Sequence, residues 1–427
     1  MAVGGLRHPL LAGSRHRHQL DNGLQVLVSA VPGSAVVSTA LWYRVGARDE
    51  PRGQAGLAHF LEHMMFKGSP RYGPGQVDRR TQALGGVNNA FTSHDATVYY
   101  FKLSPAHWRE ALAIEADRMA ALTLGPEAVS GERQVILEEI AMYESDPWDA
   151  LEQAVAELLY GGHCYARPVL GTRLELASLG GDELAAFHRR HYRPDNALLV
   201  VAGGVAIAEA TAAVEGALGA LPGGAAGRPR LSQELMAPPG LRRLERAHGE
   251  VPRMLLLLPA PPADHPDHPL LRVLAAALAE GRTSRLHDEL VEEREACLWV
   301  SAEVSATEGP GSFAIQAELH AGAEPAAVEE SVLRHLAALR AEVMAAAELE
   351  RCRQGVLADW LFAHEQVHQQ GLSLGFGAAL FGDEAYVERS LWQASQAAAG
   401  SLVEAARRWL DPDAGGVVGW TLPAEAR

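Results

Sequence analysis

The chain has 427 residues, which is enough for two domains that each bury a core of their own. Its 48% hydrophobic and 21% charged residues are typical of a globular protein, and a formal net charge of −16 argues against nucleic acid as a partner. The three cysteines, Cys164, Cys297 and Cys352, are far apart in the sequence and argue against a disulfide framework or a cysteine-based zinc site.

The N-terminal region, residues 1–19, has no apolar run of signal-peptide length. No segment approaches the roughly 18 consecutive apolar residues of a membrane helix, so we expect no membrane partner. A cytoplasmic protein is the expectation, with the periplasm as the alternative if a leader has been removed. We interpret Arg15-His16-Arg17-His18 as a solvated N-terminal segment and not as a metal site.

In the first half of the chain, β-rich and helical segments follow one another. Two β-rich runs, at 24–28 and 36–45, follow the turn signal Asp21-Asn22-Gly23 and are expected to pair as a hairpin. Further strands are predicted at 89–93, 96–101 and 197–202, and helices at 56–67, 76–84, 105–122 and 126–143.

A segment rich in proline and glycine, residues 223–240, separates this half from the next. The second half repeats the outline: strands are predicted at 254–258 and 313–319, and helices at 268–280, 284–295 and over most of 326–353. Pro194-Asp195 and Pro412-Asp413 each precede an apolar strand, 218 residues apart, which suggests a duplicated domain. We therefore predict an α+β protein with domains at 1–222 and 241–427, each a mostly antiparallel sheet with helices on one face.

The motif His59-x-x-Glu62-His63 stands in the predicted helix 56–67. Positions i, i+3 and i+4 share one helix face, so the two imidazoles could bind one zinc ion with a carboxylate beside them. A catalytic zinc needs a third protein ligand, and the acidic helix that contains Glu132 and Glu139 offers one. These two residues are seven apart and share a face, whereas Glu138 points elsewhere.

Several segments resemble the pitrilysin/insulinase family of inverted-zincin peptidases, in particular its processing-peptidase-like members of roughly 45 kDa. The matching segments are 56–68, 85–92, 132–140, Gly171-Thr172 and 191–196. The resemblance implies that each chain forms half of a clamshell, binds one zinc ion and hydrolyses short or unfolded peptides.

The resemblance also implies individual roles. His59, His63 and Glu139 would be the zinc ligands, Glu62 the general base that activates the attacking water, and Glu132 an acidic residue that supports the site. Asn89, Ala90 and Phe91 would lie on an edge strand that binds substrate by β-augmentation.

The chain departs from the family pattern in its second half. Active members carry an arginine and a tyrosine, seven residues apart, that hold the substrate and stabilise the oxyanion. Val291 and Leu298 occupy these positions here, and neither side chain can donate a hydrogen bond. We therefore predict the zinc-bearing subunit of a heterodimer whose partner supplies the pair. One alternative is activity as a single chain or homodimer, in which a residue such as Arg285 or Arg294 replaces the pair. The other is a non-catalytic subunit like the core subunits of respiratory complexes.

A second motif, His364-Glu365-x-x-His368, has the ordinary zincin order. Its polar surroundings and the lack of a nearby acidic third ligand favour a solvated helix face, with a second metal site as the open alternative.

Overall fold

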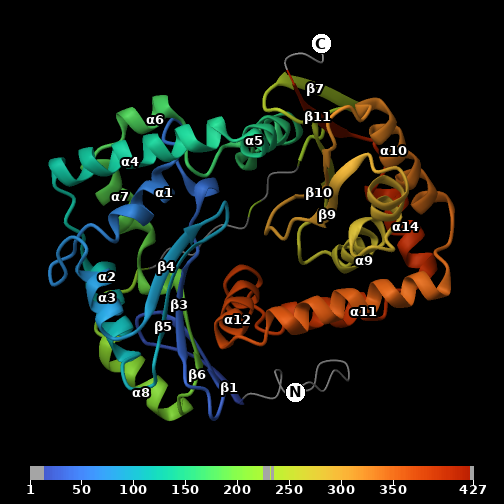
Figure 1. Ribbon diagram of the computed structural model, residues 1–427. Helices are drawn as coiled ribbons and strands as arrows, with labels where there is room; N and C mark the ends of the chain where they lie inside the picture. The colour runs from blue at the N-terminus through green and yellow to red at the C-terminus, as the bar shows by residue number, and fades with distance from the viewer. Residues whose placement is uncertain (1–13, 225–230, 232–234, 424–427) are drawn as a thin grey trace. The chain divides into compact units, whose positions relative to one another are not determined.

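The computed structural model describes residues 14–224, 231 and 235–423, which form two compact units (Figure 1). The described parts of residues 1–141, 167–230 and 361–387 make up the first unit, and those of 142–166, 231–360 and 388–427 the second. Each unit contains one mixed β-sheet and several helices, so the predicted α+β class with two similar domains is confirmed.

The sheet of the first unit has six strands in the order β1-β2-β6-β3-β5-β4. β2 and β6 run parallel, and the other neighbours are antiparallel. The strands are β1 (Ser14–Gln19), β2 (Gln25–Ala30), β3 (Val37–Tyr43), β4 (Val87–Thr92), β5 (Thr97–Leu103) and β6 (Ala197–Gly203).

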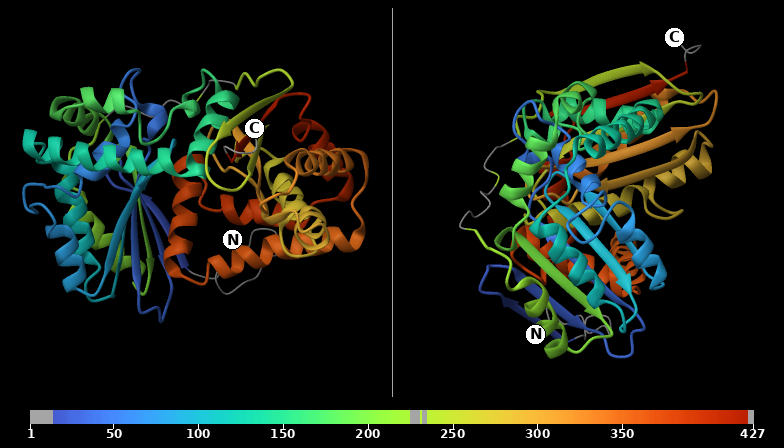
Figure 2. Two further views of the ribbon diagram at one scale, coloured as in Figure 1. Left: turned by 45° about the horizontal axis from the view of Figure 1, so that its top comes forward. Right: turned by 90° about the vertical axis from the view of Figure 1, so that its left-hand side faces the viewer.

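The sheet of the second unit has five strands in the order β7-β11-β8-β10-β9, and Figure 2 shows both sheets from two further directions. The strands are β7 (Leu241–Ala247), β8 (Arg253–Ala260), β9 (Cys297–Val304), β10 (Gly311–Leu319) and β11 (Gly416–Leu422). The last strand of each unit lies between two others in the same way. β6 is parallel to β2 and antiparallel to β3, and β11 is parallel to β7 and antiparallel to β8. The order β2-β6-β3-β5-β4 therefore repeats as β7-β11-β8-β10-β9, as the predicted duplication requires.

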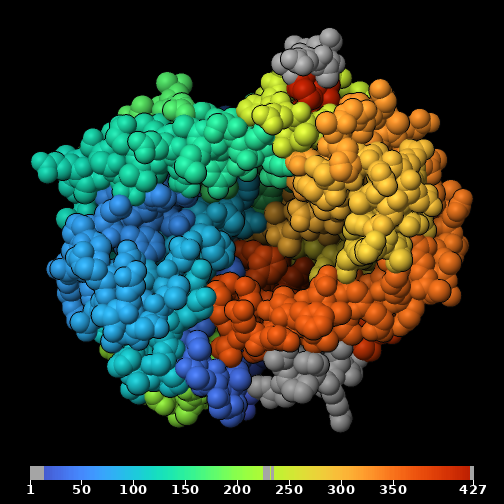
Figure 3. All heavy atoms as spheres, in the orientation of Figure 1, coloured from blue at the N-terminus to red at the C-terminus, as the bar shows by residue number. Residues whose placement is uncertain are grey.

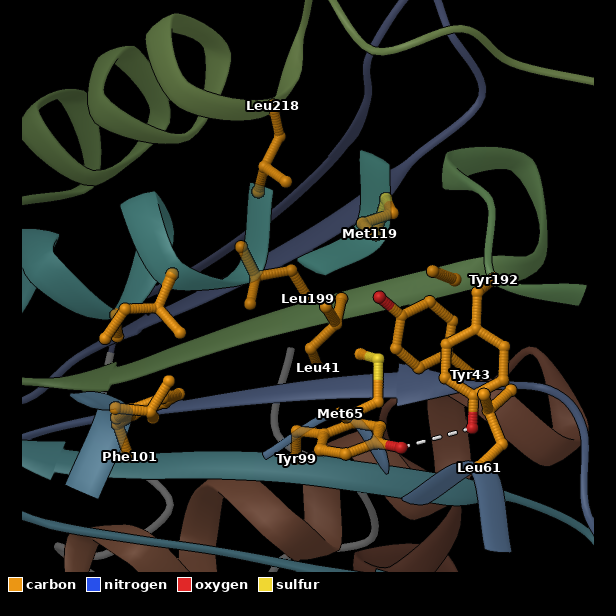
Figure 4. Close-up of a cluster of buried hydrophobic side chains, with 14 of the residues drawn as sticks. Leu41, Tyr43, Leu61, Met65, Tyr99, Phe101, Met119, Tyr192, Leu199 and Leu218 are labelled. Atoms are coloured by element: carbon orange, nitrogen blue, oxygen red, sulfur yellow. Dashed lines mark hydrogen bonds between the residues drawn. The ribbon is translucent and has the colours of Figure 1, made fainter. Parts of the chain in front are cut away.

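Helices of the first unit pack on one face of its sheet around a large apolar core (Figure 4). Tyr43, Tyr99 and Tyr192 lie at one end of this core, where the hydroxyls of Tyr99 and Tyr192 are 3.2 Å apart. The helices of this unit are α1 (Leu57–Met64), α2 (Gln76–Ala83), α3 (Arg109–Ala120), α4 (Pro126–Ser145), α6 (Arg173–Ser178), α7 (Gly181–His191), α8 (Ile207–Leu218) and α12 (Val367–Phe381).

The opposite face of this sheet is covered by α12, a helix that comes from the second half of the chain. Leu374, Ala378 and Ala379 of α12 pack against Trp42 and its apolar neighbours on β2, β5 and β6. A Cβ at Gly375 would lie 2.1 Å from the indole nitrogen of Trp42, so only glycine allows this close approach.

The second unit contains a helix from the first half of the chain in the corresponding place. α5 (Pro147–Tyr160) packs on β8 and β11 through Leu151, Val155 and Leu159. The compact units thus exchange residues 142–166 and 361–387 and differ from the contiguous ranges 1–222 and 241–427. The other helices of this unit are α9 (His268–Ala279), the π-helix η5 (His287–Glu293), α10 (Pro325–Ala341), α11 (Ala346–Ala363), α13 (Tyr386–Ser395) and α14 (Ala399–Trp409).

One prediction about the N-terminal region is wrong. β2 and β3 do not form a hairpin, because β6 lies between them and pairs with both. The segment Arg15-His16-Arg17-His18 belongs to the edge strand β1, which pairs with β2, and its side chains are exposed or half-buried. Residues 225–230 and 232–234 of the predicted linker lie outside the described residues.

The prediction of a solvated face at His364 and His368 is also wrong, because both side chains are buried. The Nδ1 of His368 lies 3.0 Å from the hydroxyl of Ser38 on β3, and His364 pairs with Ser373. Within the described residues, the histidines and acids close enough to share a metal ion do not include this pair. No helix in the described part of the chain is long and apolar enough to cross a bilayer.

Candidate metal centre

Helix α1 carries the first motif and is fixed at its N-terminus by a buried carboxylate. The backbone N–H groups of Gly56 and Ala58 donate to Glu50, at 3.1 and 2.8 Å. Gly56 has a φ of +91°, and a Cβ on Gly171 would lie 2.3 Å from the carbonyl oxygen of Ala55. The two glycines therefore let two backbone segments meet where α1 begins.

The apolar residues of α1 face the core and leave the motif residues on the other side. Leu57, Phe60, Leu61 and Met64 are almost fully buried in the core. This spacing is typical of an amphipathic helix, and it presents His59, Glu62 and His63 together as predicted from the sequence.

Helix α4 places Glu139 opposite these histidines. The Oε2 of Glu139 lies 3.7 Å from the Nε2 of His59 and 3.6 Å from the Nε2 of His63. Ligands of a tetrahedral zinc ion, with bonds of about 2.1 Å, are about 3.4 Å apart. The three atoms are therefore spaced as zinc ligands would be, and the exposed Glu138 is turned away.

The environment of Glu139 fits a cation between these groups. Its Oε2 is buried and accepts no hydrogen bond from any described residue. An unsatisfied buried carboxylate oxygen is costly, and a metal ion bound to two neutral imidazoles and this oxygen would satisfy it. Burial, with His63 beside it, lowers the pKa of His59 to about 3, so His59 is neutral and can act as a ligand.

Glu132 contacts His63 on the side of the ring opposite Glu139. The Nδ1–H of His63 donates to the Oε1 of Glu132 at 2.8 Å, which leaves Nε2 directed at Glu139. Lys67 contacts the other oxygen of Glu132, at 2.6 Å. Burial alone would raise the pKa of Glu132, but the hydrogen bonds from His63 and Lys67 outweigh it and lower that pKa. Glu132 is therefore a carboxylate that supports His63, and this position agrees with the supporting role that the resemblance implies.

Glu62 is 9% exposed and accepts a hydrogen bond from the hydroxyl of Thr92 on β4, with Oγ1 and Oε2 2.5 Å apart. Burial raises the pKa of Glu62, and the hydrogen bond from Thr92 opposes this rise. A carboxylate with a raised pKa is a better proton acceptor, which suits a general base.

Strand β4 lies at the edge of its sheet beside α1. Asn88, Ala90 and Thr92 face α1 and α2, whereas Asn89 and Phe91 are exposed on the other side of the strand. The ring of Phe91 contacts Trp42 edge-to-face. The edge position fits the predicted substrate strand, and the roles of Asn89, Ala90 and Phe91 stay predictions.

Val291 and Leu298, at the positions of the arginine and tyrosine, lie in the second unit. Val291 is half-buried on η5, and Leu298 is exposed on the edge strand β9. The two proposed stand-ins are engaged locally: Arg285 makes two hydrogen bonds to Glu348, and Arg294 donates to Ser331.

Three supporting residues were not predicted from the sequence: Lys67, Thr92 and Glu50. Lys67 follows His63 by four residues, so helical spacing could have placed it on the same face. Thr92 and Glu50 reach α1 from segments 30 and six residues away, and no local pattern marks them.

Figure 3 shows α4, in blue-green, at the surface. The buried residues of this helix are Val129, Glu132, Ile136 and Ile140. Val135 and Met142 are exposed on this helix, together with Glu138. Glu139, whose side chain is 30% exposed, thus lies at the boundary between the core and the surface.

Comparison with known proteins relates this geometry to a family. Residues 25–173 match the family model "Insulinase (Peptidase family M16)", and residues 178–356 match the model "Peptidase M16 inactive domain". An uncharacterized zinc protease of Streptomyces coelicolor is 31% identical over 331 residues, which cover 74% of this chain and 70% of that protein. An uncharacterized zinc protease of Mycobacterium leprae is 34% identical over 65% of this chain and 63% of its own length.

A solved structure of a protease from Helicobacter pylori has the same fold. It superimposes with a TM-score of 0.90 at 24% identity, over 96% of this chain and all of that chain. The range that matches the first family model, residues 25–173, contains both His59 and Glu139, and the expected family resemblance is confirmed. The chain therefore belongs to the insulinase family, peptidase family M16.

Proposed function

We propose that this chain is a zinc metalloendopeptidase that hydrolyses short or unfolded peptides. The observation that carries the proposal is the position of the Oε2 of Glu139. This atom is buried, accepts no hydrogen bond from the described residues and lies 3.6–3.7 Å from the Nε2 atoms of His59 and His63. Relatives named as zinc proteases support the choice of metal. A structural subunit would need neither this ligand set nor a buried carboxylate beside it.

A zinc ion held by His59, His63 and Glu139 would lower the pKa of a coordinated water to about 7 and polarise the scissile carbonyl. Glu62 then accepts a proton from the attacking water and passes it to the leaving amine. Glu132 keeps His63 in one tautomer and orientation. β4 lies at the edge of its sheet, where an extended peptide could pair with its backbone, and the N–H of Ala90 there donates to the Oδ1 of Asn89 at 2.9 Å.

The metal is tested by measuring zinc bound per chain after dialysis, in the wild type, Glu139→Gln and Glu138→Gln. Glu138 precedes Glu139 on α4 but is exposed, so it is a matched control. We expect one zinc per chain in the wild type and in Glu138→Gln, and a loss of zinc in Glu139→Gln. Equal zinc in all three proteins would contradict the assignment.

We further propose that full activity needs a partner subunit that carries the arginine and tyrosine. Val291 and Leu298 cannot donate hydrogen bonds to an oxyanion, and the loss of one such donor typically costs about 10²–10³ in turnover. The ion pairs of Arg285 with Glu348 and of Arg294 with Glu289 disfavour these arginines as substitutes.

Partner dependence is tested by comparing kcat of the zinc-loaded chain alone with kcat of its complex with a homologous chain that has the pair. We expect the complex to be faster by about 10² or more. In the chain alone, Val291→Arg/Leu298→Tyr should raise kcat, whereas Val291→Met/Leu298→Phe, which adds size without such donors, should not. Equal rates for the chain and its complex would contradict the partner requirement.

A further inference from the structure

Thr92 links the edge strand β4 to the carboxylate of Glu62. Alternate residues of β4 point to the same side, and on the side of α1 and α2 these are Asn88, Ala90 and Thr92. Asn88 donates to Asp78 on α2 at 2.8 Å, and Thr92 lies 2.5 Å from the Oε2 of Glu62 on α1. The Asn88 amide thus connects β4 to α2, and the Thr92 hydroxyl connects β4 to α1 through Glu62, the proposed base.

Thr92 is the side-chain hydrogen-bond donor to Glu62 among the described residues. His63, Glu139 and Arg118 act on Glu62 through their charges and not through a hydrogen bond. A carboxylate that is nine-tenths buried and held by one donor has one committed oxygen and one available oxygen. The hydrogen bond therefore fixes which oxygen of Glu62 is free.

Resting on the proposed function, we infer that Thr92 is a positioning residue for proton transfer. Its hydroxyl donates to Oε2, so Oε1 is the oxygen that takes the proton when the O–H bond of the attacking water breaks. The same Oε1–H then delivers the proton to the nitrogen of the leaving amine, and Glu62 returns to the carboxylate. Thr92 itself exchanges no proton with the substrate.

The arrangement of β4 extends this role to substrate binding. Asn89 and Ala90, the residues expected to pair with a peptide, precede Thr92 by three and two positions on the same strand. A peptide added to this edge would order the backbone from which the Thr92 hydroxyl projects. Peptide binding and the alignment of Glu62 would then both depend on residues 89–92 of β4.

The substitution that isolates the hydroxyl is Thr92→Val, which keeps the branched shape. Thr92→Ser keeps the hydroxyl and loses the methyl group. Thr97→Val is the control, because Thr97 pairs with Thr92 across β4 and β5 but donates its hydroxyl to the backbone carbonyl of Val45. Each protein is assayed zinc-loaded on a fluorogenic peptide for kcat and KM, with zinc content and the unfolding midpoint measured in parallel.

We expect Thr92→Val to lower kcat by about 10- to 100-fold, because small misplacements of a reacting group have costs of this size. KM and zinc content should stay near the wild-type values, Thr92→Ser should retain most of the activity, and Thr97→Val should keep kcat even if its midpoint falls. Wild-type kcat in Thr92→Val, an equal loss in the valine and serine variants, or a loss of zinc in Thr92→Val would each overturn the inference.

Glu62→Gln separates this inference from the proposed function. If the zinc-loaded wild type is no faster than Glu62→Gln, the peptidase assignment fails, and the positioning role fails with it. If Glu62→Gln abolishes hydrolysis while Thr92→Val leaves it intact, the peptidase assignment stands and only the inference about Thr92 is overturned.

Discussion

At the scale of single residues, Glu132 supports the candidate metal centre through its contact with His63. Glu132 is 5% exposed, bonds to the Nδ1 of His63 and is held in turn by Lys67. This carboxylate contacts no reacting group, yet it decides the orientation of a ligand.

We predict that Glu132→Gln weakens zinc binding by about 10- to 100-fold, the usual cost of losing such a partner. A competition titration with a chelator measures it, and Glu127→Gln, an exposed position in the first turn of α4, is the control. Unchanged affinity in Glu132→Gln would show that His63 needs no support.

A second residue, Glu295, adopts a backbone conformation that its side chain disfavours. It is the non-glycine residue with a positive φ, +49°, within the described part of the chain, and its side chain is exposed. We predict that Glu295→Gly stabilises the second unit by up to about 1 kcal/mol, because glycine adopts this conformation without the steric cost. Urea unfolding checks this, and a lower midpoint in the variant would contradict it.

Whether a residue of the site could be predicted from the sequence depends on its distance along the chain from the other residues of the site. His59, Glu62 and His63 could be grouped from helical spacing alone, because one turn of α1 brings them together. Glu139 came from a family resemblance, since nothing in the sequence states that α4 faces α1. Thr92 and Glu50 could not be predicted, because their contacts depend on how β4 and the loop before α1 pack.

At the scale of elements, α12 shows that the spacing of two histidines does not reveal whether they are buried in a core. His364 and His368 have zincin spacing, but a glycine-containing helix face packs this segment on β3 and β6. His368 is then buried against Ser38 and the ring of Tyr100. The failed hairpin between β2 and β3 has a similar cause, because a strand from residue 197 onwards pairs between them and local turn signals do not reveal it.

Burial of His368, together with the charge of Lys102, lowers its pKa from 6.5 to about 4. The neutral form is therefore favoured in the folded protein, and its contribution to stability is complete above pH 6.5 and is lost as the pH falls towards 4. Because Ser38 and Tyr100 contact the neutral ring, we predict that His368→Gln is less stable than the wild type at pH 7.5. The difference in thermal midpoint should shrink by pH 5, whereas a constant difference would contradict the assignment.

At the scale of the whole molecule, the duplication could be predicted in outline but the exchange of segments could not. The two Pro-Asp turns mark β6 and β11, which hold equivalent places in their sheets. Nothing in the sequence of α5 or α12 assigns either helix to the sheet of the other half. The candidate metal ligands lie in the first unit, whereas Val291 and Leu298 lie in the second.

The central claim is that this chain cleaves peptides with a metal held by His59, His63 and Glu139 and with Glu62 as the base. The most direct measurement compares peptide hydrolysis by the wild type and Glu62→Gln, each chelator-stripped and then reloaded with one zinc per chain. We predict that the wild type loses activity on stripping and regains it on reloading, while Glu62→Gln binds zinc equally well and stays inactive. Equal hydrolysis by the two zinc-loaded proteins, or full activity in the stripped wild type, would contradict the claim.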